Sequence, residues 1–151
     1  MSVPPLVTAT DMLRTEATTG ILGYRLRRAQ LSVFQRFLEV FEEARLRPAE
    51  YTVLLLIADN PGRKQTEIAE VLGIKRANFV TLVHGLEARH LVERRAAADD
   101  RRANALFLTS AGGRFLAEAR ARHEQMEQQL VTQLGGEANR AQLLALLERL
   151  T

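Results

Sequence analysis

The chain of 151 residues has no cysteine, no tryptophan and only four prolines. Without cysteine it can form no disulfide, no thiolate metal site and no cysteine nucleophile, and it cannot sense oxidants through a thiol. No run approaches the roughly 18 uncharged apolar residues that a membrane span needs, so no transmembrane helix is expected. The first twenty residues lack a basic start followed by an apolar segment, which argues against a secretory signal and favours the cytoplasm.

The usual signatures of enzymes are also missing. There is no glycine-rich phosphate loop and no serine, histidine and carboxylate set around a nucleophile turn. The three histidines, His84, His90 and His123, are scattered along the chain, with no carboxylate cluster beside them. We therefore expect neither an enzyme, nor a metal, nor a cofactor.

The chain is rich in apolar and charged residues, at 46% and 26%, which is typical of a soluble globular protein of one domain, or two small ones sharing a core. Its charge is unevenly placed, since residues 75–102 hold seven basic and four acidic side chains and therefore the whole net charge of +3. Such a local excess suggests contact with a polyanion. A solvated face with chance clustering explains it equally well.

Apolar spacing predicts a largely helical chain. A loose arm over residues 1–10 precedes a helical pattern over 12–44 that is apolar on two faces. Pro48 begins a second helix, whose apolar run 53–58 also permits a strand. A short helix over 65–72, a turn at Gly73 and a longer helix over 75–90 follow. Two short strands are then expected at 91–95 and 104–108, joined by the polar loop 96–103.

The C-terminal third is expected to be helical as well. Thr109 or Ser110 caps a helix with a heptad-like apolar seam, which ends at Gly135-Gly136, and a leucine-rich helix follows over about 137–150. These helices and the first one carry more apolar surface than one small chain can bury, so we expect a dimer built from both chain ends. A monomeric bundle is the alternative.

The short helix, the glycine turn and the following helix form a helix-turn-helix pattern. Lys75, Arg76 and Asn78 lie on the first turn of the second helix, where Lys or Arg can donate to guanine and Asn can bind adenine. Thr81 and His84 follow one and two turns later, within reach of bases or phosphates. The pattern alone is weak, because many helix pairs pack around a glycine turn.

The predicted hairpin supports the same interpretation. An arginine at its tip, such as Arg102, suits the negative potential of a minor groove. Asp100 is placed to hold that guanidinium by a charge-assisted pair. A charged, solvated turn is the alternative.

Four segments resemble the MarR family of winged-helix transcriptional regulators: 48–54, 68–74, 82–94 and 99–109. The most specific element is Asp100, Arg102, Leu108 and Thr109 in the hairpin. The resemblance runs from about residue 20 to the C-terminus. It implies a mainly α fold with a small β-hairpin wing, in which a winged helix-turn-helix domain over 47–109 joins a helical dimerisation region formed by 11–46 and 110–151.

The resemblance also implies a homodimer on a pseudo-palindromic double-stranded DNA operator, usually as a repressor. The carried-over recognition positions are Lys75, Arg76, Asn78 and Thr81, and the wing arginine is Arg102, which stands beside Arg101. Lys75 departs from the family, which often has Asp or Ser there as a helix cap.

In most members of the family a small ligand, often aromatic or anionic, loosens DNA binding. An aromatic carboxylic acid or its acyl-CoA thioester is the effector that we expect here. The local set of one tyrosine and three arginines at 24–28 suggests a carboxylate or phosphate site, although these arginines are also explained as surface charges. The expected pocket residues are Tyr24, Arg25, Arg28, Phe34, Tyr51 and Phe115. A helical adaptor that binds proteins and not DNA is the alternative function.

Overall fold

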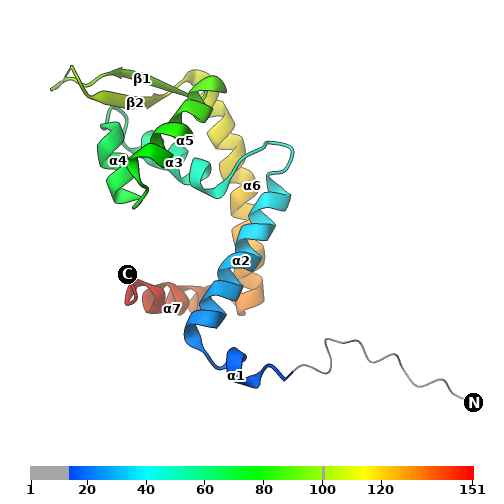
Figure 1. The fold of residues 1–151 in the computed structure, drawn as a ribbon. Helices are drawn as coiled ribbons and strands as arrows, with labels where there is room; N and C mark the ends of the chain where they lie inside the picture. The colour runs from blue at the N-terminus through cyan, green and yellow to red at the C-terminus, as the bar shows by residue number, and fades with distance from the viewer. Residues whose placement is uncertain (1–13, 100) are drawn as a thin grey trace, which may run out of the picture. The chain divides into compact units, whose positions relative to one another are not determined.

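The computed structural model describes residues 14–99 and 101–151. The predicted arm over 1–10 and Asp100 therefore lie outside the described residues. The described part is mainly helical with one two-stranded sheet, as predicted (Figure 1). The elements are α1 (Glu16–Thr19), α2 (Leu22–Val40), α3 (Pro48–Asp59), α4 (Gln65–Val71), α5 (Arg76–Ala88), β1 (Val92–Ala96), β2 (Asn104–Leu108), α6 (Ser110–Leu134) and α7 (Glu137–Glu148). None of the described helices is both long and apolar enough to span a bilayer.

The chain divides into two units, Met1–Gln35 and Arg36–Thr151. The prediction of one helix over 12–44 is wrong in its described part, because the chain breaks after α1 at Gly20 and leaves α2 after Val40. Two β-branched residues and a glycine make the first break favourable, and Arg25 Nε donates to the carbonyl of Thr19 across it at 2.7 Å.

The core of the second unit surrounds α3. Pro48 occupies its first turn, and the carboxylate of Glu50 accepts a hydrogen bond from the backbone of Arg47 at 2.8 Å, which satisfies a free amide at the helix start. The apolar run is therefore a buried helix and not a strand. Against it pack side chains from α2, α5, β2 and α6, among them Phe37, Phe41, Phe79, Val83, Leu86, Leu106, Leu116, Ala119 and Met126.

The hairpin pairs β1 with β2 in antiparallel register, Val92 opposite Leu108. The first strand lies one residue later than predicted. A third segment extends the sheet, because Leu106 donates to the carbonyl of Arg63 at 3.0 Å and Gly62 donates to that of Leu106 at 2.9 Å. The wing is thus attached to the α3–α4 connection as well as to its own strands.

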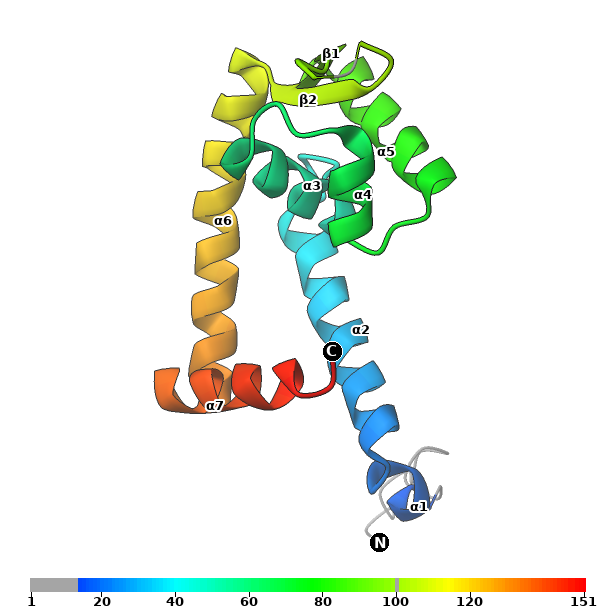
Figure 2. The ribbon, with the colours of Figure 1, turned by 90° about the vertical axis from the view of Figure 1, so that its left-hand side faces the viewer.

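Of the two predicted caps of α6, Thr109 and Ser110, the structure has Thr109. Its hydroxyl accepts from Gly112 at 2.9 Å and donates to the carbonyl of His90 at 2.6 Å. The helix runs from the wing to Gly135, where the chain turns into α7 (Figure 2). Its expected seam residues Leu116, Ala119 and Met126 are buried.

Candidate nucleic-acid interface

Helices α4 and α5 form the predicted helix-turn-helix. The carboxylate of Glu67 accepts from the backbone of Lys64 at 2.8 Å and begins α4, while Ile68 and Ala69 are buried. Gly73 takes φ +63°, a conformation that favours glycine, and turns the chain into α5. Phe79, Val83 and Leu86 then fix α5 to the core.

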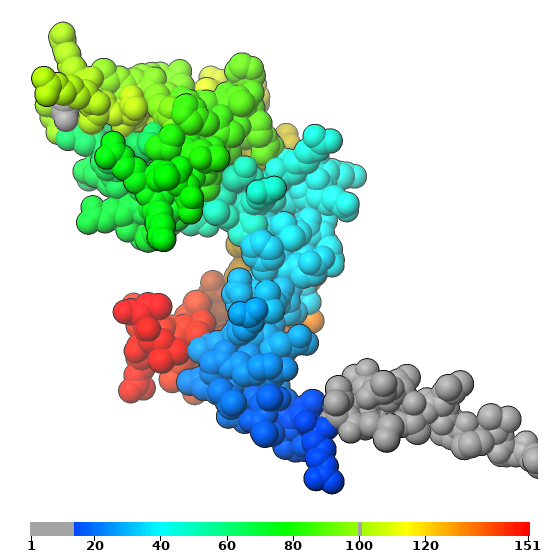
Figure 3. Space-filling view, viewed as in Figure 1, coloured from blue at the N-terminus to red at the C-terminus, as the bar shows by residue number. Residues whose placement is uncertain are grey.

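The opposite face of α5 is exposed and carries the predicted recognition residues. Lys75 precedes the helix as its N-cap and makes no side-chain capping bond. Asn78, Thr81 and His84 follow at a spacing of three, all exposed, with the Thr81 hydroxyl donating to the carbonyl of Ala77 at 3.1 Å. Figure 3 shows green side chains of α4 and α5 next to the yellow-green wing on one face of this lobe.

A hollow of about 480 Å³ lies between α4, α5 and the wing. It brings Arg76 of the recognition helix and Arg102 of the wing together with two further cations, Lys64 and Arg94. None of the described residues lining it is acidic. Two of these cations lie beside carboxylates, Lys64 beside Asp99 and Arg94 beside Glu87. Arg76 and Arg102 stand on the two sides of the hollow, so the site is suited to a polyanion that contacts helix and wing at once.

Lys64 also fixes the wing, a role that the sequence did not reveal. Its ammonium lies 2.8 Å from the carboxylate of Asp99 in the loop between the strands. This hydrogen bond is the main reason that the pKa of Asp99 lies below its usual value. The predicted wing-positioning residue was the neighbouring Asp100. Only the pairing of the Arg63 backbone with Leu106 brings Lys64 to the hairpin, and spacing along the chain gives no sign of it.

Arg94 is a second residue that sequence reasoning missed. Its guanidinium lies 3.2 Å from the carboxylate of Glu87 and so ties β1 to α5. The same carboxylate lies 3.5 Å from the ring of His84, which therefore has a protein neighbour on the recognition face. The signal available in the sequence was alternation, since Val92 and Arg94 point to the same side of the strand.

The six expected effector residues are divided between the two units of the chain. Tyr24, Arg25, Arg28 and Phe34 belong to the N-terminal unit, where all four are exposed. In the second unit Tyr51 is only 6% exposed, and its ring contacts those of Phe37, Phe41 and His123. Burial raises the pKa of the Tyr51 phenol. The guanidinium carbon of Arg89 lies over the ring of Phe115, 5.1 Å from the ring centroid.

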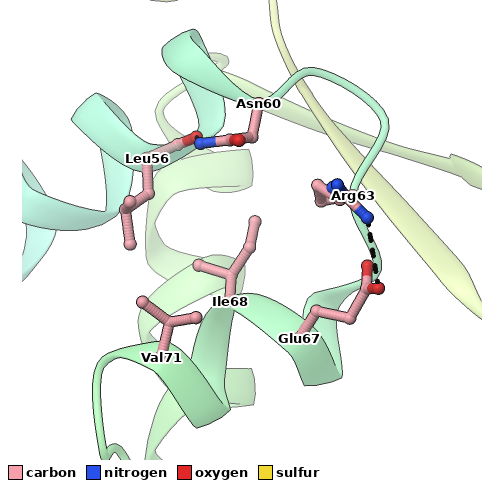
Figure 4. A pocket seen from close by; sticks show the side chains of 6 residues that line it. All are labelled: Leu56, Asn60, Arg63, Glu67, Ile68 and Val71. Atoms are coloured by element: carbon pink, nitrogen blue, oxygen red, sulfur yellow. Dashed lines mark hydrogen bonds and ion pairs between the residues drawn. The ribbon is translucent and has the colours of Figure 1, made fainter.

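A different hollow, of about 390 Å³, lies between α3 and α4. Leu56, Ile68 and Val71 form its apolar side, and the ion pair of Arg63 with Glu67 stands at its other side (Figure 4). None of the six expected effector residues lines it. It is therefore a separate apolar site with a cation at its rim.

Comparison with known proteins now decides the family. The MarR family profile matches residues 46–103. A protein of Thauera aromatica assigned to regulation of the hcr operon is 33% identical over 132 residues, which are 87% of this chain and 79% of that protein. The chain belongs to the MarR family. Its members are transcriptional regulators.

Solved MarR-family structures agree in fold. The transcriptional repressor CouR bound to a 23-mer DNA duplex has a TM-score of 0.86 and 43% identity, covering 91% of this chain and 97% of that chain. CouR bound to p-coumaroyl-CoA has a TM-score of 0.83 and 42% identity over 91% of this chain and 96% of that one. The winged-helix prediction is thereby confirmed.

Proposed function

We propose that this MarR-family protein binds a pseudo-palindromic DNA operator as a homodimer, represses transcription, and is released by an aromatic carboxylic acid or its CoA thioester. The observation that carries the proposal is the hollow shared by Arg76 and Arg102. It joins a helix suited to a major groove with a hairpin suited to the adjacent minor groove.

The contacts follow from side-chain chemistry. Lys75 and Arg76 donate to guanine, Asn78 pairs with adenine, and Thr81 and His84 lie further along the same groove. Arg101 and Arg102 enter the minor groove. The CouR–DNA complex supports this docking, because that protein shares the fold at 43% identity.

Unburied apolar surface supports the homodimer. On α7 and just after it, four leucines are 38–60% exposed in the single chain: Leu143, Leu144, Leu146 and Leu150. In the N-terminal unit Leu22, Leu31, Val33 and Phe34 are 38–65% exposed. Covering such area contributes roughly 25 cal/mol per Å², so a second copy is a favourable partner for both chain ends.

An acyl-CoA effector is supported by CouR with p-coumaroyl-CoA and by the exposed cluster of Tyr24, Arg25 and Arg28. Guanidinium groups form bidentate hydrogen bonds with carboxylates and phosphates. A tyrosine ring provides an apolar surface for an aromatic acyl group.

The DNA-binding proposal is tested by selecting duplexes from a randomised pool and measuring affinity against salt. We expect the logarithm of affinity to fall linearly with that of salt concentration, by about 0.9 for each phosphate neutralised. Arg102→Ala should cost roughly 1–3 kcal/mol, and Arg76→Ala should relax the selected half-site. Arg122→Ala, which removes an exposed arginine of α6, is the matched control. If no duplex is selected at low salt, the helical adaptor becomes the better explanation.

The effector proposal is tested by thermal shift with p-coumaroyl-CoA and simple aromatic acids, because a ligand of the native state raises the melting temperature. Arg28→Ala should reduce both the shift and ligand-induced release of DNA, leaving DNA affinity unchanged. Arg63→Ala, at the rim of the hollow in Figure 4, should respond like the wild type. The reverse result would move the ligand to the α3–α4 hollow.

A further inference from the structure

The turn after α2 ends in an uncommon backbone conformation. Arg45 has φ +48°, and the turn is closed by hydrogen bonds from Arg45 to the carbonyl of Glu42 at 3.1 Å and from Leu46 to that of Phe41 at 3.4 Å. A left-handed residue at this position commonly ends a helix and is usually glycine. An arginine is strained in this conformation, because its β-carbon lies too close to the backbone, so the conformation needs support from elsewhere.

That support comes from Arg89, the residue that follows the recognition helix α5. Its guanidinium donates to the carbonyl of Ala44 at 2.8 Å and to that of Arg45 at 3.1 Å. These carbonyls lie at the C-terminal end of the helical segment, where partial negative charge favours a cation. One side chain therefore joins the end of α5 to the strained turn.

Two further contacts hold the guanidinium itself. It lies over the ring of Phe115 at 5.1 Å from the centroid, and 4.0 Å from the carboxylate of Glu50. The first is a residue of α6 and the second of α3. The Arg89 side chain is thus fixed by three elements besides its own.

Resting on the function proposed above, we propose that Arg89 is a positioning residue for DNA recognition, which fixes the C-terminal end of α5 against the 41–46 turn. The helix has 13 residues and is therefore about 20 Å long at 1.5 Å per residue. A small rotation at its C-terminal end displaces Arg76 and Asn78 at the other end. Base contacts depend on that placement, whereas phosphate contacts by other residues do not.

The side-chain chemistry distinguishes arginine from lysine at this position. A planar guanidinium reaches two carbonyls and stacks on a ring at the same time, whereas an ammonium on a flexible stem does not keep all three contacts. Arg89→Lys preserves the charge and is the conservative variant. Arg89→Met removes the charge and the hydrogen bonds but keeps an apolar stem. Arg149→Met, which removes an exposed arginine after α7, is the control for loss of an arginine.

The first measurement is amide hydrogen exchange of the full chain without DNA. We expect exchange of Arg45 and Leu46 to be at least tenfold faster in Arg89→Met and intermediate in Arg89→Lys. The wing amides and the Arg149→Met control should match the wild type. Exchange at the wild-type rate for Arg45 and Leu46 in both Arg89 variants would overturn the proposal that Arg89 fixes the turn.

The second measurement is affinity for the selected duplex as a function of salt. We expect about tenfold weaker binding by Arg89→Met with an unchanged salt slope, because the Arg89 guanidinium is engaged by backbone carbonyls and not by phosphate. A slope smaller by about 0.9 would instead make Arg89 a phosphate contact and overturn the proposal. If the wild type itself selects no duplex, the proposed function fails, and the exchange result alone decides whether Arg89 fixes the turn.

Discussion

Two adjacent glycines show how local packing at single residues holds the wing to α6. A β-carbon on Gly112 would lie 1.9 Å from the carbonyl oxygen of Leu91, whereas one on Gly113 would meet nothing within 4 Å. Leu91 cannot withdraw freely, since its carbonyl also accepts from Thr109 at 3.1 Å. The start of α6 therefore lies directly on the backbone that enters β1.

Gly112→Ala should destabilise the protein by about 3 kcal/mol or more, because the helix or the strand entry must move to admit the methyl group. Gly113→Ala should stabilise it by about 0.5–1 kcal/mol, since alanine is the better helix former. Urea unfolding of the two variants measures both effects. If both variants lost the same free energy of unfolding, α6 would not approach Leu91 as closely as described.

His90 offers a residue-level test of backbone strain. It takes φ +56° as the second residue after α5, where its own N–H donates to the carbonyl of Glu87 at 2.8 Å. His90→Gly should raise the free energy of unfolding by about 1 kcal/mol, because glycine adopts this conformation without a clash. Ala117→Gly, at an exposed position inside α6, should lower it by about 1 kcal/mol. Thermal unfolding of both variants gives the comparison, and a loss of stability in His90→Gly would contradict the assignment of strain.

Among the helices, four segments end at a residue with positive φ, and the sequence predicted only two of these ends. Gly73 and Gly135 adopt positive φ, and both turns were expected from the glycines. Arg45 and His90 also adopt positive φ, although neither is a glycine. Their ends depend on tertiary contacts, the Arg89 guanidinium in one case and the Thr109 hydroxyl in the other, so residue type alone gave no sign of them.

The wing shows the same division between local and long-range information. Alternation and turn composition predicted both strands to within one residue, because these are properties of consecutive residues. The Lys64–Asp99 pair joins residues 35 positions apart, and it exists only because the α3–α4 connection extends the sheet. The predicted pair of Asp100 with Arg102 is a different contact and stays a prediction, because Asp100 lies outside the described residues.

The ion pair gives a prediction for the wing as an element. The carboxyl of Asp99 should titrate with a pKa below 3.8 in the wild type and return toward 3.8 in Lys64→Met, because the lysine hydrogen bond favours the ionised form. Because the pKa of Asp99 is lower in the folded state than in the unfolded state, the pair stabilises the wing fully at pH values above the unfolded-state pKa. This stabilisation is lost as the pH falls through the folded-state pKa. Carbon-13 NMR titration of the Asp99 carboxyl measures the shift. An Asp99 pKa that is the same in both proteins would show that the two groups do not pair in solution.

At the scale of the whole molecule, the charge excess of residues 75–102 is divided among different tasks. Arg76, Arg94 and Arg102 line the hollow, whereas Arg89 binds backbone carbonyls and Arg95 pairs with Glu93. Lys64, from outside that stretch, completes the basic surface. Charge counting thus located the lobe that carries the interface, but only the fold separates residues facing the hollow from those that hold the lobe together.

The apolar surface of α7 gives the last prediction, which concerns assembly. Leu146 is 49% exposed in the single chain, so covering its exposed half in a symmetric dimer contributes about 0.75–1.5 kcal/mol in each subunit. A glutamate there would also have its carboxylate buried in each subunit, which adds to the cost. Leu146→Glu should therefore raise the dimer dissociation constant at least about 100-fold and weaken binding to a two-half-site operator. Gln142→Glu adds the same charge to an exposed position of α7 and should leave the dimer intact. Sedimentation equilibrium measures both variants, and a Leu146→Glu protein that stays dimeric at wild-type affinity would place the subunit interface away from this helix.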